Sequence, residues 1–179
     1  MCKREKRNLN SKKEFIHCTG CGASVPDIQG PTHKYLGASP GCWKIFGDIL
    51  AKEYSDQAYM RVHRLTVDAY AVQHIGDKSP QTIQSINLHL LALCVALEHG
   101  VKYSFIPQIM NKKIKEYKNV FAWLSPPKYF GAITVVDVAK AKNAKEHEKL
   151  VSDWAKAAWD SWKHHHKIIE NYLRSIDYY

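Results

Sequence analysis

The amino-acid sequence predicts an all-α fold, a helical bundle of about five helices with an N-terminal cysteine-containing loop segment. Residues 59–74, YMRVHRLTVDAYAVQH, are apolar nearly all round a helical wheel, which indicates a central helix that other helices cover. Two more segments, about 81–99 and 145–175, carry apolar residues at helical spacing. No stretch alternates between apolar and polar residues as a half-buried strand would.

The chain has the length and composition of one globular domain. Its 179 residues are 45% hydrophobic and 24% charged, ordinary values for a protein with a substantial core. The first fourteen residues are rich in charge and poor in apolar side chains. We therefore expect a basic disordered tail at residues 1–14 and a single helical domain at residues 15–179.

The net charge of +9 does not by itself indicate nucleic-acid binding. Six lysines and arginines stand against two glutamates within the first fourteen residues, so much of the excess lies in the expected tail. The remaining excess is spread over residues 112–118 and the lysines after residue 140. Spread lysines are typical of a solvated surface, and no basic stripe interleaved with aromatic residues is present. This pattern speaks against specific nucleic-acid binding.

The apolar runs and the cysteines indicate the compartment. The longest apolar run, LLALCVAL at residues 90–97, is too short to span a bilayer, and no signal-peptide core follows the basic start. Five cysteines, an odd number without a signal peptide, favour reduced thiols or metal ligands over disulfides. We expect a cytoplasmic protein with no membrane partner.

A candidate metal knuckle lies in the glycine- and proline-rich segment 17–42. Cys18 and Cys21 are two residues apart and Gly22 follows them, as where two thiolates hold one ion and glycines permit a tight turn. A segment with so little apolar content needs another source of stability, which a metal supplies. A redox-active pair is the weaker alternative, because such pairs normally open a helix beside a strand and no βαβ pattern is visible.

Two further residues in this segment complete a ligand set for zinc. His33 and Cys42 extend the pattern to C-x2-C-x11-H-x8-C, three sulfurs and an imidazole, which is enough for a closed tetrahedral site. The simpler interpretation makes Cys42 a small buried apolar residue and His33 a surface loop residue. His74, at the end of the predicted central helix, is the alternative fourth ligand.

Start and stop signals place the helices. Ser-Pro pairs at residues 39–40 and 79–80 each supply an N-cap and a proline at the first helical position. They open helices that we expect to end near Tyr54 and near His99, where Gly100 is a typical C-terminal stop. A fourth helix is expected at residues 107–117, and the last at about 145–175.

Four polar residues at or beside apolar positions are candidate catalytic residues: His63, Asp68, His89 and His165. Asp68 lies between apolar positions of the central helix, where a charge is costly unless it is paired. Arg64, one helical turn earlier, is the simpler partner and would make Asp68 structural. The alternative is that Asp68 orients His89 or His165 from a neighbouring helix.

Helix geometry limits which histidines can share an ion. His63 and His74 lie on one face of the central helix but are separated by roughly 16 Å, at about 1.5 Å of rise per residue. They cannot bind one metal while that helix is continuous. A site within the bundle must therefore draw histidines from several helices, or His74 must complete the cysteine site.

Several blocks of the sequence resemble an uncharacterised bacterial family defined only as a domain of unknown function. The resemblance covers about residues 18–166, and Thr19 and Ile75 stand where the family pattern has prolines. It implies no activity and no mechanism. The blocks that carry it are CTGCGA, GPTHKY, SPGCW, HRLTVDAYAVQH, the helix from Ser85 to Leu90 with His89, and the tryptophan-rich C-terminal helix.

Three classes of function fit these observations. The first is a structural zinc module on a helical bundle that binds an unidentified protein or small molecule. The second is a metal-dependent or acid/base enzyme with a His/Asp pocket between helices. The third is a nucleic-acid-associated regulator. A closed four-ligand site indicates a structural metal, whereas three protein ligands and an open position indicate chemistry.

Overall fold

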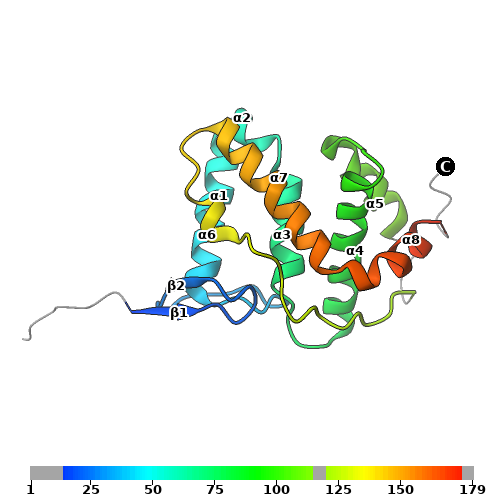
Figure 1. Ribbon diagram of the computed structural model, residues 1–179, viewed down its shortest axis with the longest axis horizontal. Helices are drawn as coiled ribbons and strands as arrows, with labels where there is room; N and C mark the ends of the chain where they lie inside the picture. The colour runs from blue at the N-terminus through cyan, green and yellow to red at the C-terminus, as the bar shows by residue number, and fades with distance from the viewer. Residues whose placement is uncertain (1–13, 115–119, 175–179) are drawn as a thin grey trace, which may run out of the picture.

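The computed structural model describes residues 14–114 and 120–174, and within these ranges the chain is largely helical (Figure 1). The all-α prediction is confirmed. The expected tail, apart from Glu14, lies outside the described residues. Among the described residues, no helix combines the length and the apolar character that crossing a bilayer requires.

A short β-hairpin precedes the helices and was not predicted. Strands β1 (Phe15–His17) and β2 (Ser24–Pro26) pair antiparallel, with Ile16 opposite Val25. Each strand has three residues, which is too short for an alternating pattern to stand out in the sequence. Val25 is fully buried, so the hairpin is anchored to the core.

Helix α1 (Pro40–Ser55) begins at the predicted Ser-Pro pair. The predicted continuous helix over residues 59–74 is wrong at its start, because a turn separates α2 (Gln57–Met60) from α3 (His63–Gln73). Asp56 caps α2 by accepting a hydrogen bond from the Ala58 amide. Val62, at the turn, has a non-helical backbone and is buried, so the core takes up an apolar side chain where the helix is interrupted.

Helix α4 (Pro80–Leu97) begins where predicted, and Ser79 accepts a hydrogen bond from the Thr82 amide. A 3₁₀ turn (Tyr103–Phe105) leads into α5 (Ile106–Ile114). The end predicted for this helix, residue 117, lies outside the described residues.

The predicted long C-terminal helix is in fact interrupted. Helix α6 (Val135–Val138) is followed by α7 (Ala144–Ser161), a 3₁₀ turn (Lys163–His165) and α8 (His166–Arg174). Trp162 stands at the interruption. It is fully buried and its Nε1 donates to the Val72 carbonyl, so core packing fixes it where α7 ends.

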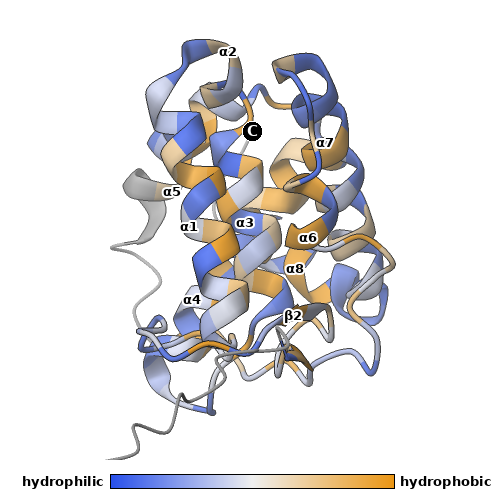
Figure 2. Cartoon of the chain, turned by 90° about the vertical axis from the view of Figure 1, so that its left-hand side faces the viewer, coloured by the Kyte–Doolittle hydropathy of each residue, from blue (hydrophilic) through white to orange (hydrophobic). Residues whose placement is uncertain are grey.

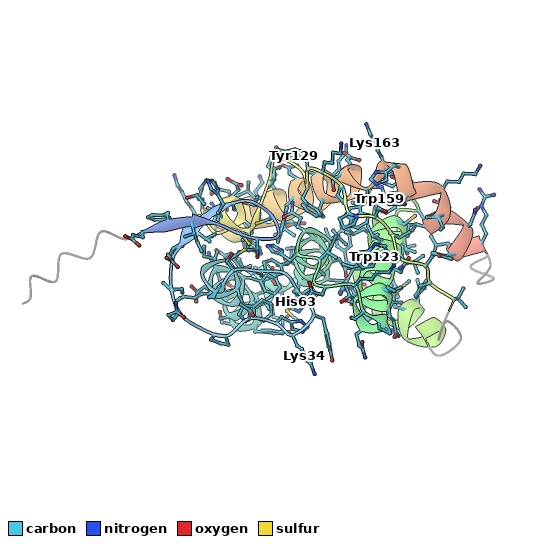
Figure 3. All side chains as sticks on the ribbon, turned by 90° about the horizontal axis from the view of Figure 1, so that it is seen from below. Lys34, His63, Trp123, Tyr129, Trp159 and Lys163 are labelled. Carbon is cyan, nitrogen blue, oxygen red and sulfur yellow. The ribbon has the colours of Figure 1, made fainter. Side chains whose placement is uncertain are left out.

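Helix α3 occupies the centre of the bundle, as its apolar surface predicted. It packs against α1, α4 and α7, and Figure 2 shows hydrophobic residues gathered on helix surfaces that face neighbouring helices. The tryptophans of the C-terminal segment belong to this core: Trp154, Trp159 and Trp162 are almost completely buried, and Trp159 lies between α7 and α4 (Figure 3). These three tryptophans are therefore core residues.

Candidate metal centre

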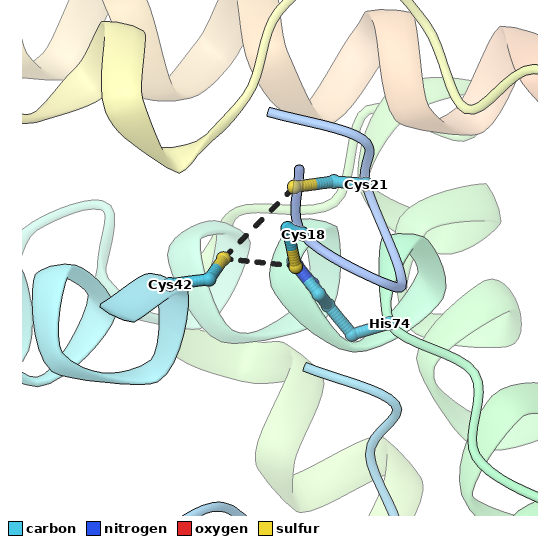
Figure 4. Close-up of side chains that lie close together, drawn as sticks. All are labelled: Cys18, Cys21, Cys42 and His74. Atoms are coloured by element: carbon cyan, nitrogen blue, oxygen red, sulfur yellow. Dashed lines mark hydrogen bonds between the residues drawn. The ribbon is translucent and has the colours of Figure 1, made fainter. Parts of the chain in front are cut away.

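Three separate parts of the fold bring four potential ligands together (Figure 4). Cys18 directly follows β1 and Cys21 lies in the turn before β2. Cys42 is in the first turn of α1, and His74 is the C-cap of α3. Residues 3, 24 and 56 positions beyond Cys18 are thus gathered with it at one end of the bundle.

The ligand atoms of these residues form a group that could hold a metal ion, since all lie within 4.8 Å of one another. The Cys21 and Cys42 sulfurs are 3.9 Å apart. The Cys42 sulfur is 3.2 Å from Nε2 of His74. At the bond lengths usual for zinc, two sulfurs at tetrahedral corners lie roughly 3.8 Å apart, and a sulfur and an imidazole nitrogen roughly 3.5 Å apart. The distances therefore suit a tetrahedral ion.

The surroundings orient the His74 ring for metal binding. Its Nδ1 lies 2.7 Å from the Tyr70 carbonyl, which can only accept, so Nδ1 carries a proton and Nε2 is directed to the cysteines. The Tyr70 ring stacks on the imidazole with ring centroids 3.9 Å apart. The Tyr70 hydroxyl donates to the Cys42 sulfur at 3.6 Å, and the Ser39 amide donates to the Cys18 sulfur at 3.5 Å. These hydrogen bonds stabilise negative charge on the sulfurs.

Three thiols and one imidazole this close share their protons unequally. Hydrogen bonds from Cys21 and Cys42 hold the pKa of Cys18 far below its usual range. The same contact with Cys18 raises the pKa of Cys42. Burial lowers the pKa of His74, but hydrogen bonds and charges from Cys18 and Cys21 outweigh burial and raise it to about 9. A bound cation would replace these protons, so metal binding should release protons to solvent.

His33, which the sequence favoured as the fourth ligand, lies outside this group. It is exposed, and its Nδ1 accepts a hydrogen bond from the Tyr35 amide at 3.2 Å. Its ring packs beside Trp43, with centroids 5.5 Å apart. The alternative ligand, His74, occupies the corner that His33 was expected to fill.

The position of the cysteine pair separates the metal interpretation from the redox one. Cys18 and Cys21 lie at the turn of a hairpin, whereas redox pairs open a helix beside a strand. The Gly22 amide donates to the Cys18 carbonyl, and the Cys18 amide donates to the Ala23 carbonyl, which closes a tight loop around the two thiols. Gly22 has a φ of 74°, a conformation that favours glycine.

Gly20 should tolerate no side chain. A Cβ at this position would lie 2.6 Å from Cδ2 of His74 and 2.7 Å from the Gly37 carbonyl oxygen. We expect Gly20→Ala to displace His74, weaken metal retention and lower the free energy of unfolding by about 1–3 kcal/mol. Chemical unfolding and metal content would measure both effects. Gly47→Ala is the control: apart from its chain neighbours and the nearby backbone of α1, no described atom lies within 4 Å of a Cβ there. This change within α1 should retain metal and leave stability equal or higher.

Asp68 makes both of the contacts that the sequence offered as alternatives. It is buried, with Oδ2 accepting from Nε of Arg64 at 2.8 Å and Oδ1 accepting from Nδ1 of His89 at 2.6 Å. His165 does not approach it, because its Nε2 pairs with the Ser125 carbonyl. Asp68 therefore joins an arginine on its own helix to a histidine on α4.

A second buried carboxylate was missed by the sequence analysis. Glu53 is fully buried and accepts hydrogen bonds from Nε2 of His147 at 2.9 Å, from Nδ1 of His63 at 2.7 Å and from the Thr66 hydroxyl. The signal was its spacing: Glu53 follows Ile49 by one helical turn on the apolar side of α1. His63 thus serves this network, at the opposite end of α3 from His74.

Stability should depend on pH through Glu53. Burial raises the pKa of this carboxyl, but hydrogen bonds from His147, His63 and Thr66 outweigh it and hold the pKa below the ordinary value of 4.5. A lowered folded-state pKa means that the contribution is fully present above pH 4.5 and is lost as the pH falls through the folded-state value. Urea unfolding from about pH 7 to about pH 3 measures this loss. Glu53→Gln, without a titrating carboxyl, should show a shallower decline; equal declines would contradict the assignment.

The fold and the site define a class: a helical bundle whose N-terminal hairpin contributes to a Cys₃His group. The chain belongs to a family of unknown function (DUF5946), whose model matches residues 16–163. This match confirms the resemblance to a domain of unknown function, and it takes in all four clustered residues. Comparisons with curated proteins and with solved structures gave no match.

Proposed function

We propose that Cys18, Cys21, Cys42 and His74 bind one structural zinc ion, which holds the hairpin and the ends of α1 and α3 together so that the bundle can bind a partner. The observation that carries this proposal is the gathering of four ligand atoms, within 4.8 Å of one another, from three separate segments. Three thiolates and one imidazole favour zinc over the oxygen-preferring cations.

A structural role fits the site better than a catalytic one. Catalytic zinc keeps an open position for water or substrate, whereas structural zinc is closed by four protein ligands. Cys18, Cys42 and His74 are buried, and Cys21 is half-buried. We place the protein in the cytoplasm, where reducing conditions keep thiol ligands free; Cys18, Cys21 and Cys42 form no disulfide.

We assign partner binding to the bundle, and favour a protein or small molecule over nucleic acid. Exposed lysines point in different directions, as Lys34 and Lys163 do on opposite sides of the molecule in Figure 3. Charge distributed in this way does not form the single basic stripe that a nucleic-acid backbone needs.

Elemental analysis of protein purified under reducing conditions tests the proposal. We expect one zinc ion per chain, with an X-ray absorption spectrum that fits three sulfurs and one nitrogen. Removal of the metal by a chelator should lower the melting temperature, and added zinc should restore it. Purified protein without zinc, and with a melting temperature indifferent to chelator and zinc, would overturn it.

A further inference from the structure

A pocket of about 390 Å³ lies where α3, α4 and the start of α5 meet, away from the cysteine cluster. Arg64 of α3 and His89 of α4 line it, together with apolar side chains from α4 and α5: Leu88, Pro107 and Met110. The volume is within the range of pockets that hold small organic molecules.

His89 offers one ring nitrogen to this pocket. Its Nδ1 is 2.6 Å from Oδ1 of Asp68, a carboxylate that can only accept, so Nδ1 bears a proton. Asp68 itself is 1% exposed, and it fixes the ring as carboxylates behind metal-binding or proton-transferring histidines do. Among the residues that the structure describes, no group pairs with Nε2, whose lone pair can therefore accept a proton from a ligand.

Arg64 offers a positive charge at the same place. Its Nε donates to Oδ2 of Asp68 at 2.8 Å, which holds the guanidinium by one edge. The terminal nitrogens make no hydrogen bond within the described part of the chain, and the side chain is 28% exposed. Among the described residues, no aspartate or glutamate lines the pocket itself, and Asp68 lies behind Arg64 and His89. A guanidinium held in this way matches the two oxygens of a carboxylate or phosphate.

We propose that this pocket binds a small organic acid, an oxyanion attached to an apolar group. Arg64 donates to the oxyanion, while Nε2 of His89 takes up the proton of the acid and donates it back to the oxyanion. Asp68 positions both groups, and Leu88, Pro107 and Met110 cover the apolar part. This inference specifies the ligand of the bundle in the proposed function. It does not depend on which metal the cysteine cluster holds, because the two sites share no residue.

Three aromatic probes test the ligand chemistry on the wild-type chain. Benzoate and phenyl phosphate carry the two oxyanions on the same ring, and benzyl alcohol is the uncharged analogue of benzoate. We expect one or both acids to shift the NMR signals of the His89 ring saturably, and benzyl alcohol to bind at least tenfold more weakly. The stronger acid identifies the oxyanion. The proposal would be overturned if neither acid bound at about 10 mM, which corresponds to a binding free energy weaker than about −3 kcal/mol. Equally strong binding of benzyl alcohol would overturn it too.

Matched variants test the contact residues. Arg64→Gln and His89→Gln should each weaken binding of the preferred acid about tenfold. Arg61→Gln removes the same charge from an exposed arginine that does not line this pocket, and should change affinity less than twofold. Equal weakening in Arg61→Gln would show general charge attraction and contradict a specific site. Zinc content measured in every variant separates failure here from failure of the zinc proposal.

Asp68→Asn tests whether Asp68 positions His89. The readout is the tautomer of the His89 ring, which a role in packing alone would not change. Arg64 Nε can only donate, so the new amide must offer its oxygen to Arg64 and its NH₂ to His89. Nδ1 of His89 must then accept, and the proton moves to Nε2. Nitrogen-15 NMR of the ring should show this change of tautomer in a folded protein. An unchanged tautomer would limit Asp68 to an ion pair within α3.

Discussion

Cys18→Ser should remove the bound metal and lower the free energy of unfolding by several kcal/mol, because a serine hydroxyl is a poor zinc ligand and metal binding is coupled to folding. Cys18 directly follows β1, and through the ion it would connect the hairpin to α1 and α3. Without the ion, the segment between β1 and α1 loses its attachment to the bundle. Urea unfolding and metal content, both under reducing conditions, measure the two effects.

Two controls make this result specific. Cys94→Ser changes another buried free thiol, one that lies outside the cluster, and should keep the metal. His33→Gln removes the histidine that the sequence alone favoured, and should also keep it. If Cys18→Ser retains metal content and stability, or if His33→Gln loses the metal, the ligand assignment is wrong.

Glu53→Ala should lower the free energy of unfolding by about 3–5 kcal/mol, the usual cost of removing one partner from a buried charged network. The loss leaves His147, which is 2% exposed, without its acceptor, and it opens a cavity between α1, α3 and α7. The Thr66 hydroxyl keeps only its longer contact, 3.4 Å, with the Val62 carbonyl. Urea unfolding near pH 7 measures the difference.

The control for Glu53 is an acidic residue on the same helix. Asp48 pairs with Lys44 across one turn of α1, and both side chains are more than 60% exposed. Asp48→Ala should therefore cost only a few tenths of a kcal/mol. Similar losses in the two variants would contradict a special role for the Glu53 network.

The sequence predicted the helices better than their interruptions. Apolar spacing continues across Arg61 and Val62, and across Trp162, because the core needs apolar side chains there whether or not the backbone is helical. Hydrophobic periodicity reports which side chains are buried and not where hydrogen bonding within a helix stops. The hairpin escaped notice for the related reason that each strand is too short to show a period.

The candidate site was predictable in its cysteines and ambiguous in its histidine. The short spacing of Cys18 and Cys21 identifies them as a ligand pair. Sequence separation alone does not decide whether His33 or His74 reaches the same ion. The choice depends on where the end of α3 packs, which local spacing does not encode. In the structure, an isolated β-bridge between Leu36 and Ile75 holds the loop before α1 against the end of α3. This packing places His74, the neighbour of Ile75, beside the cysteines.

For the two buried carboxylates, Asp68 and Glu53, local sequence likewise does not identify the partners. Asp68 was suspected because a charge between apolar positions needs a partner, but the choice among Arg64, His89 and His165 required the packing of α3 on α4. Glu53 carried an equally clear signal in its position on the apolar side of α1. Its partners come from α3 and α7, 10, 13 and 94 residues away, so no short motif contains them.

A crystal structure of the purified protein, with anomalous data collected on both sides of the zinc absorption edge, tests the central claim most directly. We predict one zinc peak about 2.3 Å from the sulfurs of Cys18, Cys21 and Cys42 and about 2.0–2.1 Å from Nε2 of His74, with no water bound to the ion. A map of zinc-supplemented protein with no peak between these residues, or with the ion held by His33 in place of His74, would contradict the account.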